Sequence, residues 1–225
     1  MSRSDAFGWL RDRSMTLTML ALFAVCAVGQ IAAGWVEYNH TLTAHGGLAV
    51  ALGGYVTSGH FWEAIFENWE SEFLQMSAFV VLSAYLYQIG SPESRRPGVH
   101  ELVDADPRQF RDQPDVPWPV RRGGWALWAY QYSLGGALFL LFLLSFAGHL
   151  VGGWAEQNAD QRLHGEAAIT LLGYATSSRF WFESLQNWQS EFLSVGAMVW
   201  LAVYLRQRGS PESKPVHAPH AETGR

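Results

Sequence analysis

The sequence predicts an all-α membrane protein in which four transmembrane helices form two tandem repeats of the same orientation. Three observations predict this fold: two long segments carry no charge, the chain matches itself at a fixed offset, and the arginines gather at one set of helix ends. Short interfacial or re-entrant segments on the outer side complete each repeat. Only 16% of the 225 residues are charged, where soluble domains usually have about a quarter.

The two long uncharged segments predict the first and third helices. Between Arg13 and Glu37 lie 23 uncharged residues, and between Arg122 and Glu156 lie 33. A helix needs about 20 apolar residues to cross a bilayer, so we expect spans at about 14–36 and 124–154. A cleaved signal peptide is the alternative for the first segment, but the matching segment later in the chain cannot be one.

Two shorter apolar stretches predict the second and fourth helices. They run from 73 to 89 and from 192 to 205, and each begins directly after a glutamate. They reach spanning length only if the preceding turn joins the helix, so we expect spans at about 69–89 and 188–208. Ser58 is the expected N-cap of the longer helix that contains the second span.

The second half of the chain repeats the first at an offset of 119 residues without a gap. From 28 to 94, 32 of 67 aligned positions are identical, which is too many for chance. Each half reads as helix, connector and helix, closed by Gly-Ser-Pro, in which glycine takes the left-handed conformation. The expected organisation is a first repeat at 1–90, a cytoplasmic linker at 91–122, a second repeat at 123–209 and a disordered cytoplasmic tail at 210–225.

The distribution of arginine predicts the topology. Arginines precede the first helix, fill the linker and follow the fourth helix, whereas the two connectors hold only Arg162 and Arg179. By the positive-inside rule, both termini and the linker are cytoplasmic. The apolar pieces at 48–56 and 167–175 are too short to cross, and if they crossed, the arginines would lie on both sides. We therefore expect them to be interfacial or re-entrant.

The composition excludes several classes of function. The net charge is −5 and no dense basic patch exists, so nucleic acid is not an expected partner. Cys26 is the single cysteine, which excludes a disulfide framework or a cysteine zinc site. The absence of a phosphate loop, a zincin helix or a nucleophile elbow weakens the case for an enzyme without closing it, and no cofactor is predicted. The expected partners are the lipid bilayer and a second copy or another membrane protein.

Polar residues that occur in both repeats form the candidate site. A carboxylate near the membrane interface is costly unless it is paired or hydrated, so a repeated glutamate is a functional candidate. We expect the two copies to converge at the outer mouth of the bundle and to bind a metal ion, a proton or a small polar solute. The alternative is that these residues only bond the connector backbone and stabilise the fold. The residues are Glu72, Glu191, Asn68, Asn187, His45 and His164.

Other polar residues lack a counterpart in the second repeat. An acidic stripe on another face of the second helix, formed by Glu63, Glu67 and Glu70, is replaced there by phenylalanine and glutamine. His149 corresponds to Gln30, and we interpret it as a hydrogen bonder between packed helices. The adjacent spacing Gly148-x-x-x-Gly152 predicts close packing of the first and third helices.

The repeated motif Asn-Trp-x-Ser-Glu-Phe-Leu at 68–74 and 187–193, with Thr-Ser-x-x-Phe at 57–61 and 176–180, resembles an uncharacterised family of bacterial integral membrane proteins, a domain of unknown function. The resemblance covers nearly the whole chain apart from the linker and the tail. It implies four spans in the bacterial cytoplasmic membrane and carries no assigned activity. Binding or transport at the polar site and a structural or partner-binding role both remain open, and a membrane-embedded enzyme or redox carrier is the third hypothesis.

Overall fold

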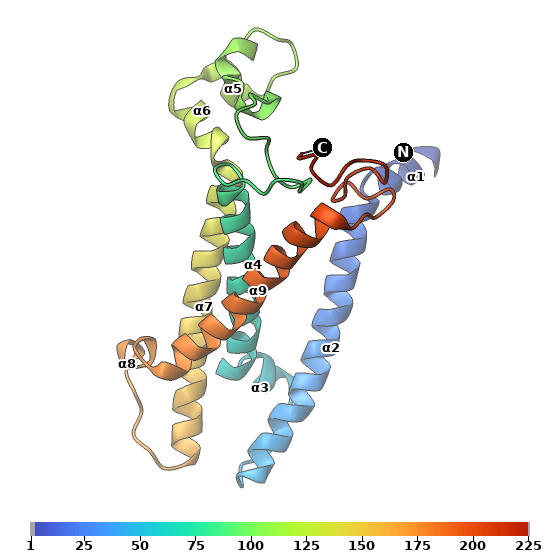
Figure 1. Cartoon of the computed structure of the whole chain (residues 1–225). Coiled ribbons are helices and arrows are strands. Elements are labelled where there is room, and N and C mark those ends of the chain that lie inside the picture. Colours follow the sequence, from blue (N-terminus) through green and yellow to red (C-terminus); the bar gives the residue numbers. More distant parts are fainter. Residues whose placement is uncertain (1–2, 225) are drawn as a thin grey trace. The chain divides into compact units, whose positions relative to one another are not determined.

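The computed structural model describes residues 3–224, and within them every regular element is a helix, which confirms the all-α prediction. Long helices dominate the described residues, and Figure 1 labels them. They are α2 (Ser14–Ala44), α4 (Gly59–Leu82), α7 (Ser133–Leu163) and α9 (Ser178–Tyr204).

Shorter helices complete the described residues. Two of these helices have five residues each: α3 (Leu52–Val56) precedes α4, and α8 (Leu171–Ala175) precedes α9. The others are α1 (Arg3–Asp12), the 3-10 turns η1 (Leu102–Asp104) and η2 (Pro107–Phe110), α5 (Trp118–Arg122) and α6 (Gly124–Gln131). The elements α7, α8 and α9 begin 119 residues after α2, α3 and α4, which is the offset at which the sequence matches itself.

The helix boundaries differ from the expected spans. The helices α4 and α9 begin ten residues before the expected spans at 69 and 188, because Ser58 and Ser177 cap them: each hydroxyl accepts a hydrogen bond from the backbone N–H three residues later, at 3.2 and 3.3 Å. Glutamates inside an amphipathic helix do not end it, so the charge gap underestimates its length. The expected third helix is divided at Tyr132 into α6 and α7.

Contacts divide the chain into two units. Unit 1 comprises Met1–Trp62 and Gly152–Ile169, and unit 2 comprises Glu63–Val151 and Thr170–Arg225. The helices α4 and α7 each contribute a segment to both units.

Unit 1 shows why a tryptophan and an asparagine recur in both halves. Trp35 Nε1 donates to the Val50 carbonyl at 2.8 Å, and the Asn39 side chain donates to the same carbonyl and accepts from the Val50 N–H, at 3.0 and 2.6 Å. These bonds tie the connector to the helix that precedes it. The second half uses the same geometry, with Trp154, Asn158 and Ile169 in the corresponding places.

In unit 2, α7 packs along α4 through small residues. A Cβ atom at Gly148 would lie 2.4 Å from the Phe66 ring, so only glycine permits this approach. Further along, Ser77 Oγ donates to the Gly135 carbonyl at 3.3 Å. Gly148, for which the sequence predicts a contact with the first helix, thus lies against α4 within unit 2.

The segment at 210–224, for which the sequence predicts disorder, forms turns around one lysine. Lys214 is 2% exposed, and its ammonium group donates to the carbonyls of Pro219, His220 and Glu222 at 2.9–3.1 Å. An ammonium group offers three donors, and here three backbone carbonyls satisfy them. Composition alone does not predict that three backbone carbonyls accept hydrogen bonds from one buried lysine.

Two of the described helices, α2 and α7, are long and apolar enough to cross a membrane. No side chain of α2 is buried. The cores of both units are small, and large apolar side chains along the long helices are exposed.

Candidate functional site

One face of α4 carries three carboxylates within unit 2. Glu63, Glu67 and Glu70 are spaced by four and three residues, so they share a face of the helix. This face is turned inward: Glu63 is 6% exposed and Glu70 is fully buried. Buried carboxylates are rare unless they are paired, so their partners determine what the site can do.

His149 of α7 lies against this acidic face and is fully buried. Its Nδ1 is 3.0 Å from Glu70 Oε2, while Trp188 Nε1 of α9 donates to Glu70 Oε1 at 3.0 Å. A carboxylate only accepts, so Nδ1 carries the hydrogen of this bond. In the neutral ring, the lone pair therefore lies on Nε2.

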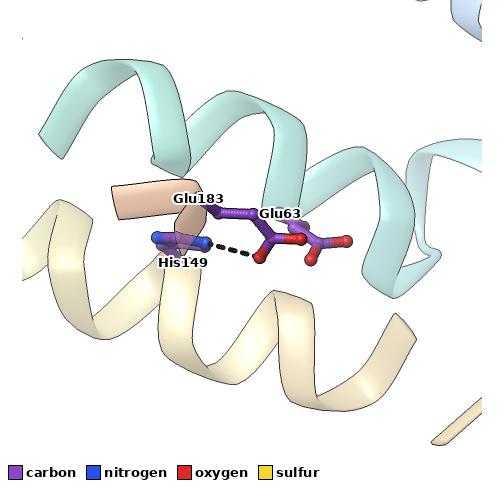
Figure 2. A group of neighbouring side chains, drawn as sticks. All are labelled: Glu63, His149 and Glu183. Carbon is purple, nitrogen blue, oxygen red and sulfur yellow. Dashed lines mark ion pairs between the residues drawn. The ribbon is translucent and has the colours of Figure 1, made fainter. Parts of the chain in front are cut away.

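The Nε2 atom of His149 points at two further carboxylates. It has no hydrogen-bond partner among residues 3–224, although it is buried, and Glu183 Oε2 of α9 lies 3.7 Å away. Figure 2 shows the ring facing the Glu183 carboxylate, with Glu63 beside it. One ligand atom from each of Glu63, His149 and Glu183 lies within 4.8 Å of the others. We call these three residues the Glu-His-Glu group.

A tyrosine and an arginine border the Glu-His-Glu group. The hydroxyl of Tyr174 in α8 is fully buried and lies 3.2 Å from Glu183 Oε2 and 3.3 Å from Glu63 Oε1. Arg179 donates to Glu183 Oε1 at 2.8 Å and to Glu63 Oε1 at 3.4 Å. The Arg179 side chain is 40% exposed and that of Glu183 is 21% exposed, so the group approaches the surface here.

The site has more acidic than basic groups. Glu67 also belongs to it, because the Asn187 amide donates to Glu67 Oε1. Four carboxylates thus surround one guanidinium and one imidazole. The environment is apolar on one side, where the ring of Phe180 lies 4.9 Å from that of His149. Negative charge in such surroundings requires a compensating cation or protons.

The structure brings the sequence-predicted histidines together in unit 1. The rings of His45 and His164 lie 5.4 Å apart at their centroids, edge to face. Each Nδ1 is 2.9 Å from the backbone carbonyl four residues earlier, at Thr41 and Asp160. Both histidines are exposed, so they form a surface pair rather than an enclosed site.

The other four predicted residues belong to unit 2. Glu72 is exposed, Glu191 is partly so, and the negative charge of Glu72 acts on Glu191. Asn68 donates to the Ala64 carbonyl of its own helix at 2.8 Å. Of the four, Asn187 reaches the buried acidic face, through its bond to Glu67.

Sequence reasoning missed the Glu-His-Glu group because it gave priority to residues present in both repeats. Neither Glu63 nor His149 is repeated, and Glu183 corresponds to an alanine. Two signals pointed to the group: an acidic stripe on a helix otherwise rich in aromatic residues, and one histidine alone in a segment of 33 uncharged residues. The position of Glu183 has no such signal.

Comparison with curated proteins finds no match. Comparison with solved structures finds none either. A family model described as a domain of unknown function (DUF6766) matches residues 6–225. Because this match covers nearly the whole length, the chain belongs to that family of uncharacterised function.

Proposed function

We propose that the chain is an integral membrane protein of the bacterial cytoplasmic membrane that binds a cation in the buried acidic site of unit 2. The observation that carries the proposal is the Glu-His-Glu group, in which a buried imidazole nitrogen without a hydrogen bond faces two carboxylates. The sequence predicts binding of a metal ion, a proton or a small polar solute at the residues that occur in both repeats. We propose cation binding at the Glu-His-Glu group instead.

The membrane assignment is supported by the surface of α2. This helix has 31 residues, and none of them is buried. In water such an apolar surface is unfavourable, at about 25 cal/mol per Å². A bilayer removes that cost, and α7 has the same length and an equally apolar window.

The remaining topology follows from charge. The helices α4 and α9 supply the second and fourth crossings, with the repeats in the same orientation; they end at Leu82 and Tyr204, before the ends of the expected spans at 89 and 208. The arginine-rich linker and both termini then face the cytoplasm. The short helices α3 and α8 lie on the outer side, as interfacial or re-entrant segments.

A bound cation explains the charges of the site better than a purely structural role in helix packing does. Ion pairs can hold helices together, but a buried acid without a basic partner is costly while it is charged. Here one guanidinium and one imidazole serve four carboxylates. A bound cation supplies the missing positive charge in a place where protein groups do not.

The topology is tested by cysteine labelling in intact cells. In a Cys26→Ser background, Gln109→Cys places a thiol in the linker and Leu48→Cys places one in a connector, where Leu48 is 87% exposed. A membrane-impermeant maleimide should label the connector thiol, and the linker thiol only after permeabilisation. Labelling of the linker thiol in intact cells overturns the four-span topology.

Cation binding is tested by thermal unfolding of the purified full chain in detergent, with Zn²⁺, Mn²⁺, Mg²⁺, Ca²⁺, Na⁺ and K⁺ added singly. A ligand at 100 times its Kd stabilises by about 2.7 kcal/mol, which raises the Tm of a chain this size by about 5–10 °C. Glu63→Gln should abolish the shift, and Glu72→Gln, a carboxylate outside the group, should retain it. If no cation raises the wild-type Tm, the buried acidic site only stabilises the packing of the helices, and the proposed function is wrong.

A further inference from the structure

We infer that the cation is a divalent transition-metal ion, ligated by Nε2 of His149 and by one carboxylate oxygen each of Glu63 and Glu183. The inference rests on the proposed function and deepens it by naming the ion and its ligands. Three helices supply the ligands, α4, α7 and α9, so the ion joins elements that are distant in the sequence (Figure 2).

The bond between His149 and Glu70 prepares the imidazole for a metal. Histidines that ligate metals usually donate their other ring nitrogen to a carboxylate or a carbonyl, which fixes the tautomer and raises the basicity of the ligand. His149 Nδ1 donates to Glu70 Oε2 at 3.0 Å, and Trp188 holds the other Glu70 oxygen. The ring is therefore oriented with Nε2 toward Glu63 and Glu183.

The separation of the ligand atoms fits a shared ion better than a hydrogen bond. His149 Nε2 and Glu183 Oε2 are 3.7 Å apart, whereas a hydrogen bond between them would measure about 2.8 Å. Two ligands that each lie about 2.1 Å from a metal at a tetrahedral angle are roughly 3.4 Å apart. The Glu63 ligand atom completes a triangle with every side within 4.8 Å, so each side must shorten by at most about 1.4 Å to close around an ion.

The donor set selects the class of ion. Mg²⁺ and Ca²⁺ prefer oxygen ligands only, whereas an imidazole with carboxylates suits Zn²⁺, Mn²⁺, Fe²⁺ and Co²⁺. Three protein ligands leave at least one position for water or an exogenous ligand. The Tyr174 hydroxyl, within 3.3 Å of both carboxylates, stands beside that position and can bond to what occupies it.

The charge of the site agrees with a divalent ion. Four ionised carboxylates, Arg179 and the neutral imidazole that a metal ligand requires together carry a net charge of −3. A divalent ion reduces the excess to one charge, and a monovalent ion leaves two. The carboxylate of Glu183 is partly exposed beside Arg179, which gives an ion a route to the group.

The test is X-ray absorption on the full chain in detergent, stripped with a chelator and reloaded with Zn²⁺. The protein carries no tag, and His45→Ala and His164→Ala remove the exposed histidine pair from the background. One Zn²⁺ per chain is expected, with an imidazole signature in its first coordination shell. His149→Gln should remove that signature and weaken binding at least tenfold, and Glu183→Gln should weaken it to a similar degree.

Two further variants keep the test decisive if His149→Gln does not fold. Glu70→Gln leaves every ligand in place and should weaken Zn²⁺ binding by about 10–100-fold while the imidazole signature persists. Glu191→Gln, a carboxylate on α9 outside the group, should bind as the parent does. The inference is overturned if the parent protein does not bind one Zn²⁺ per chain, or if the imidazole signature survives His149→Gln. If Mg²⁺, Ca²⁺ or a monovalent cation raises the Tm but Zn²⁺ does not bind, the proposed function stands and this inference fails.

Discussion

Arg179 acts as a tethered cation at the site, and its removal should tighten metal binding while it destabilises the protein. Its guanidinium donates to Glu183 at 2.8 Å and to Glu63 at 3.4 Å, and both carboxylates belong to the Glu-His-Glu group. An incoming ion must therefore compete with Arg179 for the same oxygens. Arg179→Gln keeps a polar side chain of similar length and removes the charge.

The magnitude follows from the exposure of the pair. The Arg179 side chain is 40% exposed, so each of its two ion pairs contributes about 0.2–1 kcal/mol after solvent screening. Loss of both lowers the stability of the metal-free protein by about 0.4–2 kcal/mol, or about 1–8 °C in Tm. The same free energy no longer opposes the ion, so the Kd for Zn²⁺ should fall by about twofold to thirtyfold.

The assay measures the two effects separately. Thermal unfolding without metal gives the loss of Tm, and competition with a fluorescent zinc chelator gives the Kd. Arg162→Gln is the matched control, because Arg162 Nε donates to the Asn158 carbonyl of its own helix in unit 1, and it should leave the Kd unchanged. A Kd for Arg179→Gln that is unchanged or weaker would show that the arginine and the ion do not share these carboxylates.

Three further predictions concern the fold. Gly148→Ala places a methyl group 2.4 Å from the Phe66 ring and should cost about 1–3 kcal/mol, measured as a lower Tm that Phe66→Ala partly restores. Asn39→Ala removes two hydrogen bonds to the first connector and should speed hydrogen exchange at residues 46–51; unchanged exchange contradicts the role. The backbone N–H of Glu101 and the Arg95 guanidinium hold the pKa of Asp104 below its ordinary value of 3.8. The η1 turn should therefore persist at pH 3.8 and loosen only as the pH falls further, which an NMR titration measures.

The elements were largely predictable from the sequence because local rules determine them. Uncharged segments predict α2 and α7, and the capping hydroxyls of Ser58 and Ser177 explain where α4 and α9 begin. The repeat in the sequence predicts that both halves carry the same elements, and their helices begin at the same offset. The lengths of α4 and α9 were less predictable, because a gap in charge marks an apolar window and not the end of a helix.

The candidate site was not predictable in the same way. Repetition directed attention to Glu72, Glu191 and the pair of His45 and His164, and these do form neighbouring pairs. The buried group is instead asymmetric, because each of its three residues corresponds to a different residue type in the other repeat. A duplicated sequence permits such divergence, since a site at one place in the bundle needs its ligands only once.

The sequence by itself determined the helical composition, the repeated order of helix, connector and helix, and the apolar segments, because propensity, capping and charge act along the chain over a few residues. Only the tertiary structure decided that the acidic stripe of α4 faces inward onto His149 and that Glu183 of α9 meets it there. The physical reason is that burial depends on which helices pack together. The face of α4 that carries Glu63 and Glu70 is an exposed charged stripe on the isolated helix, and it becomes a buried acidic site only where α7 and α9 cover it.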